Sequence, residues 1–261
     1  MTGVTGSAVP ILAFHKVDPV FEWGVTRIPP VQFRRVLDYL KRNGYGTVGL
    51  SQVVRNEIPI SKAVVLTFDD AYESVYRHAL PALLDAGFTA AVFVITGFVG
   101  TWNAWDVNLG GLRFRHLSWE RLRELDKLGF DIGSHTMHHP DLTQGSGLRR
   151  IQELRASKEE IEFRLGKAVP WISFPFGRYN ERVVEDSRAC GYEAGFGFLS
   201  SGPRKNPFVF ERKAVYLLEG EWNLRAKLQT SGMAAIERAK LRFINFCSRG
   251  TSLVKPPRWT A

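Results

Sequence analysis

Residues 63–87 read AVVLTFDDAYESVYRHALPALLDAG: an apolar run, two carboxylates and an amphipathic stretch that ends at a glycine. The apolar run, Ala63–Phe68, is short and rich in β-branched residues, which is typical of a strand buried on both faces. Residues Glu73–Ala86 have the pattern of a helix, and Gly87 stands where a left-handed helix cap is expected. This segment therefore predicts a buried strand that leads directly into a helix.

The same alternation of strand and helix repeats along the chain. Further strands are expected at Pro10–His15, Ala90–Thr96, Asp131–Ser134, Trp171–Phe174, Glu193–Phe198 and Val209–Leu217. Further helices are expected at Gln32–Lys41, Ser118–Leu128 (with Ser118 as its N-cap), Leu148–Leu165 and Glu181–Cys190. Repeated alternation favours a parallel sheet, and at this length a closed one. We therefore expect an α/β fold, a distorted (β/α) barrel of seven or eight strands forming a single domain over residues 1–261.

Composition agrees with one globular domain. Of the 261 residues, 44% are hydrophobic, and no Pro-rich, Ser-rich or repetitive stretch resembles a linker. Two cysteines, Cys190 and Cys247, do not make the disulfide framework of a small secreted protein. The first ten residues lack the features of a signal peptide, and no stretch approaches the ~20 apolar residues of a membrane span. These features indicate a cytoplasmic protein.

The formal net charge is +9, and the charge is concentrated near the C-terminus. Between Leu224 and Arg258, eight basic residues accompany the single acid Glu237. The basic amphipathic region covers about 222–261, and Met233–Cys247 places apolar residues at roughly helical period. Such a helix could lie on an anionic membrane surface, at the inner face of the membrane, or it could pack on the barrel with a basic outer face. No nucleic-acid recognition motif accompanies the charge, so we expect no nucleic-acid partner.

Two strand ends carry residues suited to metal chemistry. Asp69 and Asp70 directly follow the strand at Ala63–Phe68, where one carboxylate could bind a metal and its neighbour act as a base. The alternative is that they only begin the next helix. His135 and His139 follow the strand at 131–134, and a spacing of four would place them on one side of a helical turn. Two imidazoles and one carboxylate form a recurring ligand set for catalytic zinc. His138 should point away from this pair.

A third strand end has an unusual turn. Pro175 and Gly177 bracket Phe176, whose backbone N–H could donate to an oxyanion. Taken alone, this motif favours the alternative of a turn without a catalytic role.

Together the three strand ends resemble one family of enzymes. Thr67-Phe68-Asp69-Asp70, His135-Thr136-x-x-His139-Pro140 and Phe174-Pro175-Phe176-Gly177 are similar to the first three motifs of the polysaccharide deacetylases, the NodB-homology carbohydrate esterases. The resemblance extends from Ile11 to Arg212. It implies a distorted β/α barrel and a divalent metal, often Zn²⁺, held by Asp70, His135 and His139. It also implies that Asp69 is the general base, that the Phe176 N–H steadies the oxyanion, and that Pro175, Phe176 and Gly177 contact the substrate.

The chain departs from the family pattern at the general acid. No histidine follows His139, so the usual C-terminal Leu-x-His motif is missing. The strand containing His15 resembles that of the permuted branch of the family, in which an N-terminal histidine serves as the acid. In a closed barrel the first and last strands are neighbours, so this exchange would preserve geometry. The alternative is that His15 is a structural residue at a strand end.

Further positions of interest stand at other strand ends and in one loop. Ile172 or Ser173 stands where the third motif usually begins with arginine. Arg212, at another strand end, is expected to orient Asp69 through a charge-assisted bond, unless it is a solvated surface residue. Trp105 and Asp106 could line a sugar pocket, although a core tryptophan is an alternative.

The sequence thus predicts a metal-dependent hydrolase that removes the N-acetyl group from an N-acetylhexosamine in a glycan or a carrier-linked sugar. Two alternatives stay open. One is the hydrolysis of another C–N bond, in a formamide or a cyclic amide. The other is a catalytically silent barrel that binds glycan.

Overall fold

The strands form a closed parallel barrel. The computed structural model describes residues 9–22, 26–104, 112–198, 206–216 and 220–229. The sheet has the order β1-β10-β9-β8-β7-β6-β5-β4, and β1 also pairs with β5, which closes a ring of seven strands. The strands are β1 (Ile11–Phe14), β4 (Gly46–Thr47), β5 (Ala63–Phe68), β6 (Ala91–Val94), β7 (Asp131–Ser134), β8 (Trp171–Ser173), β9 (Ala194–Phe198) and β10 (Val209–Ala214). The predicted fold class is confirmed, and β1 lies between β5 and β10.

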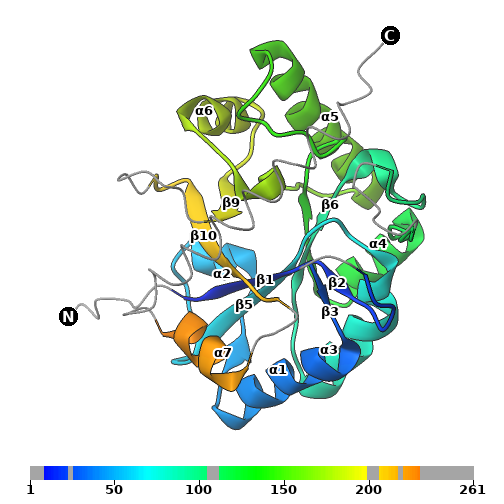
Figure 1. The fold of residues 1–261 in the computed structure, drawn as a ribbon. Helices are drawn as coiled ribbons and strands as arrows, with labels where there is room; N and C mark the ends of the chain where they lie inside the picture. Colours follow the sequence, from blue (N-terminus) through cyan, green and yellow to red (C-terminus); the bar gives the residue numbers. More distant parts are fainter. Residues whose placement is uncertain (1–8, 23–25, 105–111, 199–205, 217–219, 230–261) are drawn as a thin grey trace, which may run out of the picture.

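Helices surround this barrel (Figure 1). They are α1 (Pro30–Arg42), α2 (Leu50–Val54), α3 (Leu80–Ala86), α4 (Trp119–Lys127), α5 (Gly147–Leu165), α6 (Glu181–Ala189) and α7 (Glu221–Leu228), with short turns η2 (Thr96–Phe98) and η4 (Pro175–Gly177). Ser118 caps α4 as predicted, and Gly87 ends α3 in the left-handed conformation. Two small strands, β2 (Lys16–Val17) and β3 (Arg27–Ile28), together with β4, α2 and α7, were not predicted because each is too short to show a period.

The helix predicted at Glu73–Ala86 contains an irregularity. A π-helical turn, η1 (Val75–Ala79), precedes α3. Such turns occur mostly as single insertions in α-helices, and they leave the hydrophobic period almost unchanged. The sequence pattern therefore could not reveal it.

The two faces of β5 point into different cores. Val64, Leu66 and Phe68 pack toward the helices, in the core that also includes Phe33 and Leu37 of α1. Ala63 and Val65 belong to a second core, shared with residues of β1, β6, β8 and β9, which fills the barrel. Side chains alternate along a strand, so Thr67 and Asp69 continue the inward face. This alternation directs Asp69 to the mouth of the barrel.

No helix in the described segments is long and apolar enough to cross a membrane. The proposed sugar-pocket residues Trp105 and Asp106, and the amphipathic stretch Met233–Cys247, lie outside the described residues.

Candidate metal centre and active site

The structure brings Asp70, His135 and His139 together. One ligand atom from each lies within 4.8 Å of the others, and all three residues are buried. Asp70 Oδ1 is 3.4 Å from His135 Nε2 and 3.7 Å from His139 Nε2. Asp70 follows β5 and the histidines follow β7, so two strand ends of the barrel supply the cluster.

The histidines do not share a helical turn, so that expectation was wrong. Thr136 and His139 have φ of 66° and 60°, in the left-handed region. Side chains hold this loop: Thr136 N donates to Ser134 Oγ at 3.1 Å, and His139 N donates to Thr136 Oγ1 at 3.0 Å. Short hydrogen bonds between a side chain and a nearby backbone group compete with helix formation.

A glutamate on α5 completes the histidine loop. The backbone N–H groups of Met137 and His138 donate to Glu153 Oε2 at 3.0 and 2.8 Å. The His138 ring also pairs with Glu153, and this hydrogen bond raises the pKa of His138. His138 therefore faces α5 and lies outside the three-residue cluster, as the sequence suggested.

The chemistry of the donor set fits a cation. His135 Nδ1 lies 2.7 Å from the Ser173 carbonyl oxygen, which can only accept, so Nδ1 carries the ring proton. Burial lowers the pKa of His135, so the ring is neutral and its Nε2 presents a lone pair to the Asp70 carboxylate. Two electron-rich atoms 3.4 Å apart attract each other only through a cation. Ligands of a tetrahedral zinc ion lie about 3.3 Å apart, close to this spacing.

Asp69 is held by a buried arginine. Arg212 Nη1 and Nη2 donate to Asp69 Oδ1 and Oδ2 at 2.7 and 2.8 Å, and Arg212 is 0% exposed. The surface alternative for Arg212 is therefore excluded. Burial alone would raise the pKa of Asp69, but the adjacent guanidinium holds that pKa well below its usual range. Asp69 is thus an ionised carboxylate beside the metal cluster, fixed by a bidentate pair.

Ser173 connects the two halves of the site. Its hydroxyl accepts from Arg212 Nη2 at 2.7 Å and donates to Asp69 Oδ1 at 3.1 Å, while its carbonyl accepts from His135. Ser173 stands near the place where an arginine was expected, and β10 supplies the arginine instead. A lone serine at a strand end has no distinctive sequence signal, so this role was not predicted.

His15 approaches Asp69 from the neighbouring strand. Its Nε2 lies 4.0 Å from Asp69 Oδ2, and its side chain is 18% exposed. Desolvation lowers the pKa of His15 to about 4, although the charge of Asp69 opposes this shift. The imidazole is therefore neutral at pH 7 and adjoins the carboxylate that we expect to act as a base.

The turn after β8 lies against the histidines. Phe176 has a φ of 57°, and its ring packs edge-on against His139, with ring centroids 4.7 Å apart. Gly177 has a φ of 65°, and a Cβ there would lie 2.2 Å from the Phe198 ring. Only glycine fits this position, which fixes the backbone of the turn that also contains Pro175.

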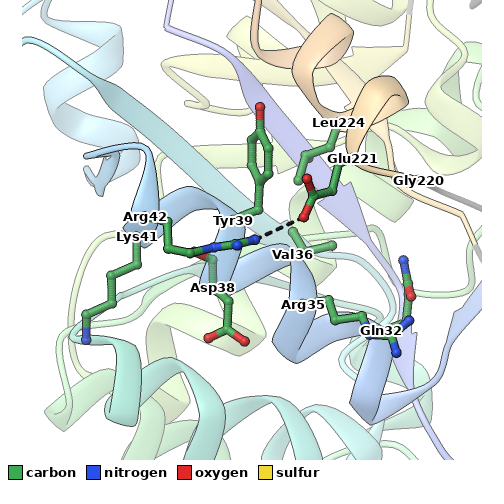
Figure 2. A pocket seen from close by; sticks show the side chains of 10 residues that line it. All are labelled: Gln32, Arg35, Val36, Asp38, Tyr39, Lys41, Arg42, Gly220, Glu221 and Leu224. Carbon is green, nitrogen blue, oxygen red and sulfur yellow. Dashed lines mark hydrogen bonds and ion pairs between the residues drawn. The ribbon is translucent and has the colours of Figure 1, made fainter.

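A separate pocket lies between α1 and α7. It has a volume of about 820 Å³, and Arg42 and Glu221 form an ion pair across it (Figure 2). Its lining includes Gln32, Tyr39 and Leu224, but none of the residues predicted to bind metal or substrate. The predicted site residues therefore lie at the barrel mouth and not in this pocket.

Comparison with known proteins identifies the family of this chain. The polysaccharide deacetylase family profile matches residues 57–195, just over half of the chain. The YxkH protein of Bacillus subtilis, whose name assigns it to the polysaccharide deacetylases, is 28% identical over 191 residues, covering 72% of this chain and 63% of YxkH. A poly-β-1,6-N-acetyl-D-glucosamine N-deacetylase of Staphylococcus aureus is 24% identical over 69% of this chain and 65% of its own length. The chain thus spans less than two thirds of these relatives.

Solved structures share the fold. The Streptococcus pyogenes deacetylase PplD, determined in complex with acetate, superposes with a TM-score of 0.72 at 26% identity, covering 85% of this chain and 98% of PplD. IcaB of Ammonifex degensii has the same fold, with a TM-score of 0.70 at 24% identity over 86% of this chain and 98% of IcaB. The matched family profile includes both the Asp69–Asp70 and the His135–His139 motifs. This chain belongs to the polysaccharide deacetylase family.

Proposed function

We propose that the protein is a metal-dependent N-deacetylase that releases acetate from an N-acetylhexosamine in a glycan or a carrier-linked sugar. The observation that carries the proposal is the placement of an ionised, buried Asp69 beside three convergent metal ligands. The names of the Staphylococcus aureus and Streptococcus pyogenes relatives, an N-acetylglucosamine deacetylase and a deacetylase bound to acetate, agree with it.

Asp70, His135 and His139 would hold the metal, for which Zn²⁺ is our first choice. When bound, a divalent cation supplies Lewis acidity that polarises the acetamide carbonyl and makes a water easier to deprotonate. The protein contributes ligands already gathered in one place and a fixed tautomer at His135, set by the Ser173 carbonyl.

Asp69 would act as the general base. As water adds to the carbonyl carbon, Asp69 accepts one of its protons, and Arg212 and Ser173 keep the carboxylate oriented. Because its pKa is held low, Asp69 gives up that proton readily. The backbone N–H of Phe176 would donate to the developing oxyanion.

His15 would deliver the proton to the leaving group. The resting imidazole is neutral, so it must gain a proton before it can donate one. Asp69, which has taken a proton from the attacking water, lies 4.0 Å away and would pass that proton to His15. When the C–N bond breaks, His15 protonates the departing nitrogen, which leaves as a free amine while the acetyl group leaves as acetate. With this assignment, we propose that the chain is most similar to the family branch with an N-terminal catalytic histidine.

Acetate release tests the proposal. The metal-loaded protein should release acetate from poly-β-1,6-N-acetylglucosamine or from smaller acetylated amino sugars, and a chelator should stop the reaction. Formate release, or the opening of a cyclic amide, would favour the second C–N hydrolase reading. Tight glycan binding without any product would favour the silent barrel.

The Asp69→Asn variant tests whether Asp69 acts as the general base and not as a metal ligand. The variant should lose at least about 100-fold in kcat, because general-base catalysis contributes a factor of that size. Its metal content should stay close to one equivalent. Loss of the metal in this variant would show that the roles of Asp69 and Asp70 are wrongly assigned.

We also propose that the basic region at about 222–261 brings the enzyme to an anionic membrane surface, where carrier-linked sugars would be available. The support is the charge asymmetry of the sequence. Pelleting with anionic vesicles should fall when the chain is truncated after Ser231. Unchanged pelleting would dismiss this region as an anchor.

A further inference from the structure

The turn that carries the proposed metal carboxylate is strained. Asp70 and Ala71 have φ of 68° and 52°, so two consecutive residues with side chains adopt the left-handed conformation. Residues with a Cβ adopt this conformation only at a cost in free energy relative to ordinary backbone. This turn sends Asp69 toward Arg212 and Asp70 toward the histidines. Surrounding structure must therefore hold it.

A segment just before α4 holds the turn. Leu117 N donates to the Ala71 carbonyl at 2.8 Å, and Glu73 N donates to the Arg115 carbonyl at 2.7 Å. Between these backbone bonds, the His116 side chain reaches the Asp70 carbonyl, with Nδ1 2.6 Å from the oxygen. Nδ1 must be the donor, because a carbonyl oxygen can only accept.

The His116 ring is locked in place. It is 2% exposed and stacks on Tyr72, with ring centroids 4.8 Å apart and planes at 21°. Within the described part of the chain, its Nε2 has no hydrogen-bond partner, so its bond to the Asp70 backbone is the polar contact that the ring makes. His116 is not one of the three clustered metal ligands.

We propose that His116 is a positioning residue for the metal centre: its Nδ1–H holds the Asp70 carbonyl and thereby directs the Asp70 carboxylate at the cation. This inference rests on the proposed metal site. Residues that orient a metal ligand usually form a hydrogen bond to the ligand's side chain. His116 instead forms its hydrogen bond to the backbone carbonyl of the ligand Asp70. Loss of such partners typically costs 10–100-fold in metal affinity.

Two substitutions separate the donor from the bulk of the ring. In His116→Asn, the side-chain amide nitrogen stands near the position of Nδ1 and can still donate to Asp70. In His116→Gln, the amide nitrogen reaches instead toward the position of Nε2, so the donor to Asp70 is displaced. Both variants lose the stacking on Tyr72, so they are matched in that loss.

The test is the dissociation constant for Zn²⁺ of the full chain, measured by competition with a chromophoric chelator, together with the absorption spectrum of the Co²⁺ form. His116→Asn should stay within about threefold of the wild type, whereas His116→Gln should bind 10–100-fold more weakly with an altered Co²⁺ spectrum. The thermal midpoints of the two metal-free variants should be similar. Equal Zn²⁺ affinity in His116→Gln and the wild type would overturn the inference.

The possible outcomes distinguish a failure of the His116 inference from a failure of the proposed metal site. If the wild type binds no Zn²⁺, the proposed function fails. If the wild type binds Zn²⁺ and both variants weaken equally, the ring stacking matters and the hydrogen bond does not. If His116→Gln does not fold, loss of affinity in a folded His116→Asn would contradict the proposal, and retained affinity with an unchanged Co²⁺ spectrum would support it.

Discussion

At the scale of single residues, the pairing of Asp69 with Arg212 determines the charge of the proposed base. Both side chains are buried, and two hydrogen bonds of 2.7 and 2.8 Å join them. A buried pair of this kind need not stabilise the fold more than apolar residues would. Breaking it is different, because the remaining charge is left buried without compensation.

Arg212→Met tests this pair. We expect the free energy of unfolding to fall by about 3–5 kcal/mol at pH 7, since Asp69 loses its counter-charge. With Arg212 present, the pKa of Asp69 is lower in the folded state, so this stabilisation exists above the unfolded pKa near 4 and is lost as the pH falls. Urea unfolding should therefore show a gap between variant and wild type that narrows as the pH falls below about 4.

Arg178→Met is the control. Arg178 pairs with Asp141 at 2.8 Å but is partly exposed, so the same substitution should cost less than about 1 kcal/mol. A pH-independent gap for Arg212→Met would contradict the assigned charge state of Asp69.

His15 makes a second prediction at this scale. Its folded pKa of about 4 lies below the ordinary value of 6.5, so the folded protein resists the proton that the unfolded chain accepts. Protonation of His15 in the unfolded chain therefore lowers the free energy of unfolding. This effect is absent above pH 7 and grows as the pH falls through 6.5. In metal-free protein, the free energy of unfolding of the wild type should fall between pH 7.5 and pH 4.5. For His15→Asn we expect this fall to be smaller by about 2 kcal/mol. Parallel pH dependences in urea unfolding would count against a desolvated, neutral His15.

At the scale of elements, the strand ends and the turns that follow them build the site. The strands were predictable, because apolar β-branched runs and glycine caps show directly in the sequence, and β5 and β7 have the predicted boundaries. The left-handed conformations at Asp70, Thr136 and Phe176 were not, because residues with side chains rarely adopt them and no sequence pattern marks them here. Glu153, Ser173 and His116 were missed because the groups that they contact lie far away in the sequence.

Gly177→Ala tests the turn after β8. A Cβ at Gly177 would lie 2.2 Å from the Phe198 ring, in a residue with a φ of 65°. We expect a loss of at least about 3 kcal/mol, or a displaced turn with strongly reduced kcat/KM, because the strain and the overlap add.

Gly166→Ala is the matched control for this turn. Gly166 has a similar φ of 69°, but no atom lies within 4 Å of a Cβ built there. Its substitution should cost only about 1 kcal/mol and leave activity unchanged. Equal losses in thermal unfolding would show that the backbone conformation alone, and not the contact with Phe198, determines the cost.

At the scale of the whole molecule, barrel closure explains how distant residues meet. β1 pairs with both β5 and β10, so His15, Asp69 and Arg212 lie on three adjacent strands although 197 positions separate the first from the last. The alternation of strands and helices predicted the closed barrel, and closure then made His15 a reasonable candidate. The sequence offered the Arg212–Asp69 pair as one of two alternatives, and the structure confirms it. It could not show that Ser173 joins this pair, because that contact depends on the register of the closed ring.

Metal should stabilise the whole fold. A ligand that binds only the folded state at 100 times its Kd adds about 2.7 kcal/mol. We therefore expect the thermal midpoint to rise when Zn²⁺ is added to chelator-treated protein. Asp70→Ala should abolish the rise, whereas a substitution in the α1–α7 pocket, such as Gln32→Ala, should preserve it. A rise that persists in Asp70→Ala would place the stabilising ion elsewhere.

The central claim is that one cation binds between Asp70, His135 and His139, with Asp69 beside it. The most direct measurement is an anomalous diffraction map of crystals grown with Zn²⁺, recorded at its absorption edge. The account predicts one dominant peak about 2.0–2.2 Å from Asp70 Oδ1, His135 Nε2 and His139 Nε2, with Asp69 still paired to Arg212. A dominant peak at another site, or none in this cluster, would contradict it.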